Sequence, residues 1–187
     1  DHVEHGKLKE SLLKQKAAAT RIRNIVETLR IISRRPAVLQ GPHDLLEVVG
    51  LGVSLLAEIF EGEGVHLSID LPPGPCWVDA SGEQLQQVLT NLLTNARDAV
   101  EKSTVKKIII RLKSSQSGFS LSVEDTGCGI PIEIQERVLE PFFTTKDVGK
   151  GTGLGLAIAA SIVREMKGIL TFDSEVGKGT QFRIWLP

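Results

Sequence analysis

Two asparagines, Asn91 and Asn95, stand one helical turn apart in a segment whose apolar residues repeat with a helical period. Together with Gln87 and Asp98 they form a polar stripe beside the apolar one. Asparagine is a mediocre helix former, so two of them on one face require an explanation. Either the face is solvated and tolerates asparagine, which the spacing alone favours, or an amide oxygen serves as a neutral Mg²⁺ ligand beside phosphate oxygens and water.

A second candidate for chemistry is the segment Asp125-Thr126-Gly127-Cys128-Gly129, which follows an alternating apolar pattern typical of a strand. An ionised aspartate only accepts hydrogen bonds, so it can select a donor such as the amino group of adenine. Glycines two and four residues later allow the backbone to pass close to a flat base. The same residues are also common in an ordinary turn after a strand, so the segment alone does not decide between the two.

Residues 149–156 alternate glycine with other residues and lead directly into a predicted helix. A glycine loop at a helix N-terminus points backbone N–H groups at an anion, and the helix dipole favours negative charge there. A Walker motif requires Ser or Thr after Lys150, where Gly151 stands, and a dinucleotide-binding motif requires a preceding strand. Neither motif fits, and the interpretation that remains is a mobile lid.

The residues before this loop supply two further features of the predicted lid. Phe142 and Phe143 are expected to form its hydrophobic anchor. Lys146 is a candidate phosphate contact, because its ammonium group is a compact point charge.

Helices and strands are needed to position these residues, and their periods predict a two-layer α+β sandwich with a mixed sheet covered by helices on one face. The longest predicted helix after the linker opens with a capping box of Ser81 and Gln84. Its apolar stripe is predicted to be buried: Leu85, Val88, Leu89, Leu92, Ala96 and Ala99. Helices are predicted over 44–60, 81–100 and 153–167, and strands over 65–71, 76–79, 106–113, 119–124, 169–174 and 180–186.

Residues 1–35 precede this domain and contain a long helical pattern that Pro36 ends. The apolar residues alternate by steps of four and three, which is typical of a coiled-coil or bundle helix, although an amphipathic helix packed on its own domain fits as well. We expect a linker over 36–43 and the main domain over 44–187.

The composition excludes several classes of partner. The formal net charge is −1, which gives no reason to expect nucleic acid or an anionic membrane surface as a partner. Cys76 and Cys128 are too few for a disulfide framework or a zinc site, so we expect a reducing, cytoplasmic compartment. No stretch is apolar enough to span a bilayer, although a longer parent protein could be membrane-attached.

Taken in order, these segments resemble the nucleotide-binding boxes of sensor histidine kinases. Residues 91–96 resemble the N box, 125–129 the first G box and 140–146 the F box. Residues 149–156 resemble the second G box and 177–182 the third. The ordered set is specific even though each piece is not, and it implies the Bergerat ATP-binding fold shared with gyrase B, MutL and Hsp90.

The resemblance also implies roles for individual residues. Asn95 would bind Mg²⁺, Asn91 would lie near the phosphates of ATP, and Asp125 would bind the adenine amino group with Thr180 close to it. Base-pocket and lid positions would be taken by Gly127, Gly129, Gly151, Thr152, Gly153, Leu154 and Gly155.

The activity implied is transfer of the ATP γ-phosphoryl group to a histidine, followed by relay to the receiver domain of a response regulator. Residues 1–35 would be the second helix of the dimerisation hairpin, so the full protein would be a homodimer.

Two departures from the family pattern affect these expectations. Some members have a basic residue three positions after the magnesium asparagine, where this chain has Asp98, so Lys146 or Arg97 would have to replace it. Nothing in the sequence resembles the H box that carries the acceptor histidine. The four histidines, His2, His5, His43 and His66, read as surface residues, and the acceptor is expected outside this chain.

Three alternatives to a histidine kinase stay open at this point. ATPases of the gyrase, MutL or Hsp90 type have a glutamate one turn before the magnesium asparagine, but Asn91 cannot act as a base. An anti-sigma-type serine kinase fits the long N-terminal helix less well. A nucleotide-gated interaction module or pseudokinase fits the missing H box but is not required by the intact ATP motifs.

Overall fold

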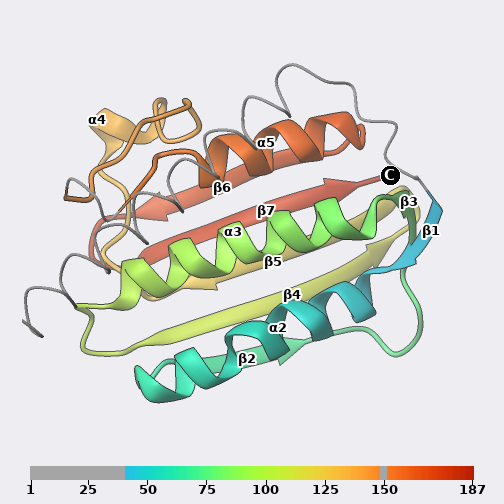
Figure 1. Ribbon diagram of the computed structural model, residues 1–187, viewed down its shortest axis with the longest axis horizontal. Helices are drawn as coiled ribbons and strands as arrows, with labels where there is room; N and C mark the ends of the chain where they lie inside the picture. Colours follow the sequence, from blue (N-terminus) through green and yellow to red (C-terminus); the bar gives the residue numbers. More distant parts are fainter. Residues whose placement is uncertain (1–40, 148–150) are drawn as a thin grey trace, which may run out of the picture.

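The computed structural model describes residues 41–147 and 151–187. Its main sheet has five strands in the order β2-β4-β5-β7-β6, and β2 pairs with β4 in parallel while the other neighbours are antiparallel. Figure 1 shows the strands side by side beneath the helices. Their bounds are His66–Asp70 (β2), Lys107–Ser115 (β4), Gly118–Asp125 (β5), Ile169–Glu175 (β6) and Gly179–Leu186 (β7).

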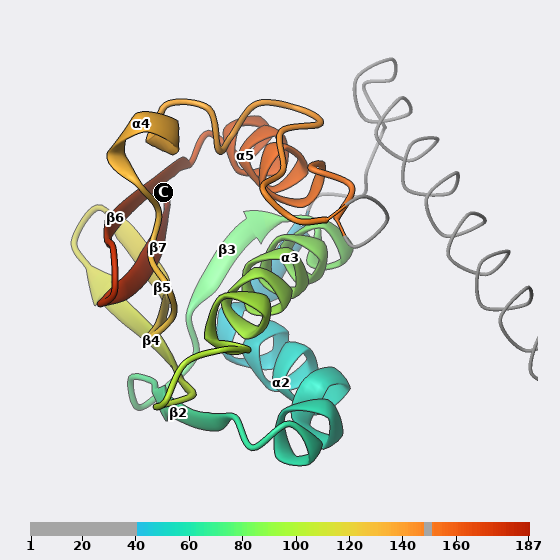
Figure 2. The same cartoon turned by 90° about the vertical axis from the view of Figure 1, so that its left-hand side faces the viewer.

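Three long helices, α2 (Leu45–Gly62), α3 (Gly82–Val100) and α5 (Gly155–Glu165), cover one face of this sheet. Figure 2 shows the two layers from the side, with the sheet at the left and α2 and α3 at its right. This arrangement confirms the predicted α+β sandwich with a mixed sheet covered on one face. A short helix, α4 (Ile132–Gln135), follows β5.

The predicted helices and strands of the main domain are present, and their ends differ from the predictions by a few residues. Two elements were not predicted. Residues 41–43, which the sequence analysis assigned to the linker, belong to β1 (Gly41–Asp44), which pairs antiparallel with β3 (Trp77–Ala80). The four residues of β1 contain Pro42 and no apolar alternation, so only the distant partner strand defines them.

The other unpredicted element is α4, a single turn without buried residues. The predicted helix over 7–35 and the linker residues 36–40 lie outside the described residues. Within the described ranges, every helix is too short or too polar to cross a membrane.

Helix α3 lies in the middle of the helical layer and forms most of the contact between the layers. The predicted stripe is buried as expected, with Leu89 and Leu92 at most 1% exposed, and Ala99 alone is only half-buried. Each fully buried leucine contributes about 2 kcal/mol through removal of its side chain from water. The polar stripe beside the buried one is therefore held in a fixed direction.

At the N-terminus of α3, one of the two hydrogen bonds of the predicted capping box is present. The Ser81 hydroxyl accepts a hydrogen bond from the backbone N–H of Gln84 at 3.3 Å. The Gln84 side chain does not return to Ser81 but donates to Glu165 at the end of α5, at 3.3 Å. This contact joins the two helices that carry the polar groups described next.

Candidate functional site

The carboxylate of Asp125 lies at the end of β5 and is 5% exposed. Its Oδ1 accepts hydrogen bonds from the backbone N–H groups of Gly127, at 2.7 Å, and Thr180, at 3.3 Å. Among the described residues no group donates to Oδ2, so this oxygen can accept a hydrogen bond from a ligand. Burial raises the pKa of Asp125 to about 6, and the two N–H donors oppose that rise. At pH 7 the carboxylate is therefore mostly ionised and acts as an acceptor.

Strand pairing places Thr180 beside this carboxylate. Asp125 and Thr180 are direct partners in the register of β5 and β7, although they are 55 residues apart in sequence. The Thr180 hydroxyl lies 2.8 Å from the Ser174 hydroxyl on β6. The predicted proximity of Thr180 to Asp125 is thus a consequence of the sheet, and Ser174 is a neighbour that the sequence analysis missed.

The turn after Asp125 has room for glycine only. A Cβ atom on Gly127 would lie 2.6 Å from both the Ala99 Cβ and the Asp125 Oδ1. Gly129 has a φ of +71°, and a Cβ there would lie 2.2 Å from the carbonyl oxygen of Glu175. The backbone N–H of Cys128 donates to the Ala99 carbonyl at 3.2 Å, which ties the turn to the C-terminal end of α3. Close packing within the protein therefore requires glycine at both positions.

The polar stripe of α3 presents Asn91 and Asn95 to the start of α5. A Cβ atom on Gly155, the first residue of α5, would lie 3.5 Å from the Asn91 Oδ1 and 3.8 Å from the Asn95 Nδ2. The Asn91 Nδ2 is buried and has no hydrogen-bond partner among the described residues. A buried donor without a partner is costly, so it indicates an acceptor that binds there.

The N-terminus of α5 supplies unpaired backbone donors at the same place. Its N-cap, Leu154, makes no side-chain cap and is instead 1% exposed in the core, where it anchors the start of the helix. The first N–H groups of a helix lack intrahelical partners and favour an anion. Before it, the Thr152 hydroxyl accepts a hydrogen bond from the Leu154 N–H at 3.3 Å.

The segment before the glycine loop packs against this loop, but not as the predicted hydrophobic anchor. Phe142 is 60% exposed and has a φ of +68°, and its N–H donates to the carbonyl of Gly153 at 2.9 Å. Phe143 is half-buried beneath the guanidinium group of Arg137, which lies 4.5 Å from its ring centroid. The prediction that Phe142 is an anchor was wrong, because its backbone bond to Gly153 turns the side chain outward.

Lys146 approaches α3 and not open solvent. Its Nζ lies 2.5 Å from the Asp98 Oδ2 and 3.5 Å from the Asn95 Oδ1. Gly151 lies close by, since a Cβ on it would be 3.1 Å from the Lys146 Cδ. The Arg97 guanidinium, the other proposed replacement for a basic residue at position 98, bonds to the Asp98 Oδ1 at 2.6 Å and lies 3.8 Å from Glu63.

The same geometry tests whether a divalent cation fits. No three His, Cys, Asp or Glu side chains gather into a metal site in residues 41–147 and 151–187. The Asn95 Oδ1, however, faces the ammonium group of Lys146, so a positive charge already lies beside this oxygen. An amide oxygen completed by phosphate oxygens and water suits Mg²⁺, which seldom relies on protein ligands alone.

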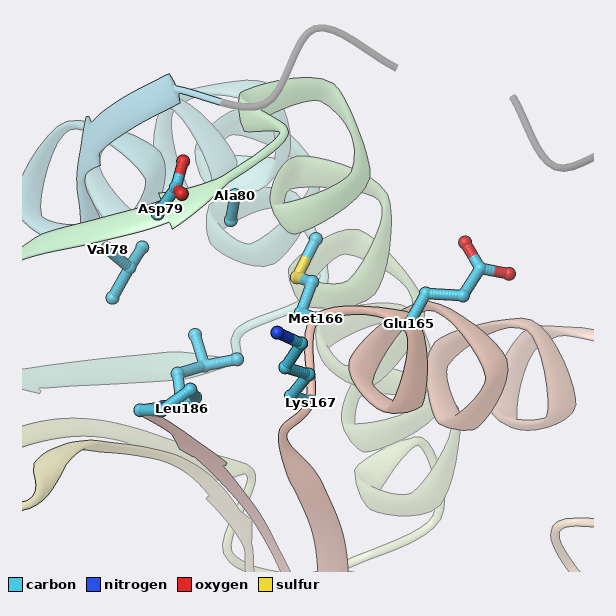
Figure 3. Close-up of a pocket in the computed structure, with 8 residues that line it drawn as sticks. Val78, Asp79, Ala80, Glu165, Met166, Lys167 and Leu186 are labelled. Carbon is cyan, nitrogen blue, oxygen red and sulfur yellow. The ribbon is translucent and has the colours of Figure 1, made fainter. Parts of the chain in front are cut away.

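A cavity of about 170 Å³ lies elsewhere, between β3, the end of α5 and the end of β7. Figure 3 shows Val78, Ala80, Met166 and Leu186 around it, with Glu165 and Lys167 directed away from one another. None of the predicted nucleotide-binding residues lines this cavity, so it is separate from the site built around Asp125 and Asn95.

Comparisons with known proteins identify the family of this chain. Residues 80–187 match the family model described as histidine kinase-, DNA gyrase B-, and HSP90-like ATPase. The sensor kinase CckA of Brucella abortus (strain 2308) is 38% identical over 185 residues, covering 92% of this chain and 20% of that protein. The C4-dicarboxylate transport sensor protein DctB of Pseudomonas aeruginosa is 33% identical over 168 residues, covering 89% of this chain and 28% of that protein. The chain thus spans between a fifth and three tenths of the length of these relatives.

Solved structures show the same fold. The nucleotide-free catalytic domain of the histidine kinase ThkA is 28% identical with a TM-score of 0.70, over 79% of this chain and 95% of that one. Full-length ShkA in complex with AMPPNP is 22% identical with a TM-score of 0.81, over 95% of this chain and 37% of that one. The chain therefore belongs to the histidine kinase-, DNA gyrase B- and HSP90-like ATPase family, as an ATP-binding catalytic domain of the sensor histidine kinase type.

Proposed function

We propose that this chain binds Mg²⁺-ATP and transfers the terminal phosphoryl group to a histidine on a dimerisation hairpin. The observation that carries the proposal is Asn91, whose buried Nδ2 has no partner among the described residues and lies one helical turn before Asn95. An amide at this position can donate to a phosphate oxygen but cannot remove a proton from water. The site is therefore suited to hold ATP without hydrolysing it quickly.

The base side of the site consists of Asp125 and the turn that follows it. The free Oδ2 of Asp125 accepts a hydrogen bond from the adenine amino group, and the bare backbone at Gly127 and Gly129 covers the flat base. Thr180 keeps the carboxylate oriented through its N–H. These groups select adenine, because the carboxylate requires a hydrogen-bond donor and the glycine backbone requires a flat ring, each at a fixed place.

The phosphate side consists of Asn91 and Asn95 on α3, the start of α5 and the loop before it. Asn91 donates to a phosphate oxygen, and the free N–H groups at Gly155 add the charge of the helix N-terminus. The loop residues Gly151, Thr152 and Gly153 close over the phosphates while the buried Leu154 anchors the start of α5, and Lys146 is a further contact.

The Asn95 Oδ1 is the proposed ligand for Mg²⁺. When bound, Mg²⁺ neutralises the charge that develops on the phosphates during transfer. The protein contributes mainly by positioning, since an in-line attack requires the acceptor nitrogen close to the terminal phosphorus.

The remaining partners belong to the same proposal. Residues 1–35 form the second helix of the dimerisation hairpin, so the full protein is a homodimer, and a response-regulator receiver domain takes the phosphoryl group from the histidine. The reaction takes place in the cytoplasm, which agrees with Cys76 and Cys128 being free thiols.

Transphosphorylation tests this proposal. The chain is incubated with γ-labelled ATP and a separate hairpin that carries the H-box histidine. Acid-labile, base-stable label is expected on the hairpin and not on this chain, and Asn95→Ala should abolish it. Fast phosphate release without labelled hairpin would identify an ATPase. Tight ATP binding with neither label nor release would identify a nucleotide-gated binding module.

A further inference from the structure

We propose that Asp98 is part of the cation position of this site. Its Oδ2 and the Asn95 Oδ1 together hold Mg²⁺, directly or through a bound water, when the nucleotide is present. The ammonium group of Lys146 occupies the same position when the nucleotide is absent. This inference rests on the assignment of Asn95 to Mg²⁺ proposed above, and it assigns a role to the residue that departs from the family pattern.

The position of the ammonium group carries the inference. The Lys146 Nζ lies 2.5 Å from the Asp98 Oδ2 and 3.5 Å from the Asn95 Oδ1. Asn95 and Asp98 are three residues apart on α3, a spacing that brings two side chains together on one face. Because an ammonium group only donates, it marks a point that both oxygens face. A carboxylate oxygen and an amide oxygen are the ligand types that Mg²⁺ takes from proteins.

The Asp98 carboxylate is held so that one oxygen is left for a cation. Its Oδ1 accepts hydrogen bonds from the Arg97 Nε, at 3.0 Å, and Nη2, at 2.6 Å. The Arg97 guanidinium also lies 3.8 Å from the Glu63 carboxylate, which attracts it. Such outer partners fix the orientation of a metal ligand, and here they direct the Oδ2 toward Asn95.

Lys146 is able to leave this position. Its side chain is 35% exposed, and the four-carbon stem of a lysine is flexible. Two cations in contact with the Asn95 Oδ1 would repel each other, so Mg²⁺ and the ammonium group exclude each other there. The nucleotide that brings the metal also brings a terminal phosphate, which gives the displaced ammonium group a new anionic partner. Lys146 thereby becomes the phosphate contact that a basic residue at position 98 would otherwise supply.

The competing explanation of the contact between Lys146 and Asp98 is a half-exposed ion pair that only attaches Lys146 to α3. Such pairs contribute about 0–1 kcal/mol to stability and have no specific effect on metal binding. The two explanations therefore differ in one measurable quantity, the dependence of nucleotide complex formation on the divalent cation.

Mn²⁺ replaces Mg²⁺ as the probe, because the electron paramagnetic resonance signal of free Mn²⁺ gives the bound fraction directly. The full 187-residue chain is saturated with a non-hydrolysable ATP analogue and titrated with Mn²⁺. Asp98→Asn should weaken Mn²⁺ binding about tenfold, the loss typical of a removed metal-site carboxylate, and Asp98→Glu should restore part of it. Glu83→Gln is the matched control, since it removes an exposed carboxylate from the first turn of the same helix, far from Asn95, and it should leave Mn²⁺ binding unchanged.

The affinity of the ATP analogue in the absence of metal separates a cation position from a purely structural ion pair. For Asp98→Asn this affinity should be unchanged or higher, because a negative charge near the phosphates is gone. In a second arm with ADP, Lys146→Met should bind Mn²⁺ at least as tightly as the unaltered chain, since no ammonium group has to leave. Weaker Mn²⁺ binding by Lys146→Met would overturn the exchange.

The remaining outcomes identify which proposal fails. If Asn95→Ala weakens Mn²⁺ binding and Asp98→Asn does not, Asp98 is not part of the cation position, while the proposed function stands. If Asp98→Asn weakens analogue binding equally with and without metal, its role is structural and the inference is wrong. If neither variant changes Mn²⁺ binding, the metal assignment of Asn95 fails as well.

Discussion

At the base side of the site a buried carboxylate is held by backbone N–H groups, whereas at the phosphate side half-exposed charged side chains hold one another. Asp125 is 5% exposed and accepts its hydrogen bonds from two backbone N–H groups, one of them fixed by the pairing of β5 with β7. At the phosphate side, Asp98 forms ion pairs with the long side chains of Lys146 and Arg97, and the three side chains are 26 to 35% exposed. The base side is thus preformed by the fold, and the phosphate side can rearrange when charge arrives. The predictions below test this difference.

The largest effect is expected at the base side. In Asp125→Asn the side-chain oxygen must stay with the N–H groups of Gly127 and Thr180, so the new NH₂ group faces the adenine amino group. Two donors then oppose each other, and the loss of a charge-assisted hydrogen bond costs about 3 kcal/mol, or roughly 100-fold in affinity. Calorimetry should show this loss with and without Mg²⁺. The control is Glu124→Gln, which changes the residue just before Asp125 on β5. An equal loss of ATP affinity in both variants would contradict the assignment of Asp125 to the adenine amino group.

A preformed buried carboxylate should also cost stability. The pKa of Asp125 is raised from 3.8 to about 6, so the folded protein binds more protons than the unfolded chain between these pH values. Stability from this group is therefore present below pH 4 and is lost as the pH rises through about 6, a change of about 2 to 3 kcal/mol. Asp125→Asn should remove this pH dependence and be more stable at pH 7. Denaturant unfolding of the nucleotide-free protein measures both, and a less stable Asp125→Asn variant would show that the carboxylate is not strained.

At the phosphate side we expect a smaller effect that depends on metal. Asn95→Ala removes the proposed Mg²⁺ ligand and should weaken ATP binding about tenfold when Mg²⁺ is present, with no loss in its absence. Gln87→Ala, on the same polar stripe two turns earlier, is the control. Calorimetry with and without a chelator decides the matter, and equal weakening under both conditions would mean that Asn95 contacts the nucleotide and not the metal.

The smallest effect concerns the backbone between Gly151 and Gly155. This loop precedes the free N–H groups of α5, so bound phosphates should reduce its local opening and slow its amide exchange several-fold. The turn at Gly127 should change less, because it is already tied to Ala99. Hydrogen exchange with and without a non-hydrolysable ATP analogue compares the two segments in one experiment. Greater protection at Gly127 than at Gly151 would reverse the proposed difference between the two sides.

Sequence reasoning predicted the elements whose pattern is local. The period of α3 and the alternation in β5 placed Asn91, Asn95 and Asp125 on the correct elements, because a buried stripe also fixes the direction of the side chains beside it. The glycine pattern likewise predicted where the chain enters α5.

Several features that depend on distant partners were not predicted. Strand β1 exists through its pairing with β3, and Gln84 reaches Glu165 and not its own helix end. The contact between Lys146 and Asp98 joins residues that are 48 apart in sequence, and no local pattern encodes it. Phe142 was expected to serve as a hydrophobic anchor of the lid, but it is exposed, with a φ of +68° and a backbone bond to Gly153.

The bond between the Cys128 N–H and the Ala99 carbonyl has a consequence for the lengths of chain that this fold accepts. Ala99 is one turn beyond Asn95, so α3 fixes the distance from the turn after Asp125 to the proposed metal ligand at about 6 Å along its axis. Deleting one residue between them would rotate Asn95 by about 100° and shorten that distance by about 1.5 Å. Insertions and deletions should therefore be tolerated between β4 and β5 but not within these four residues of α3, and a scan of single-residue deletions along the chain would map this boundary.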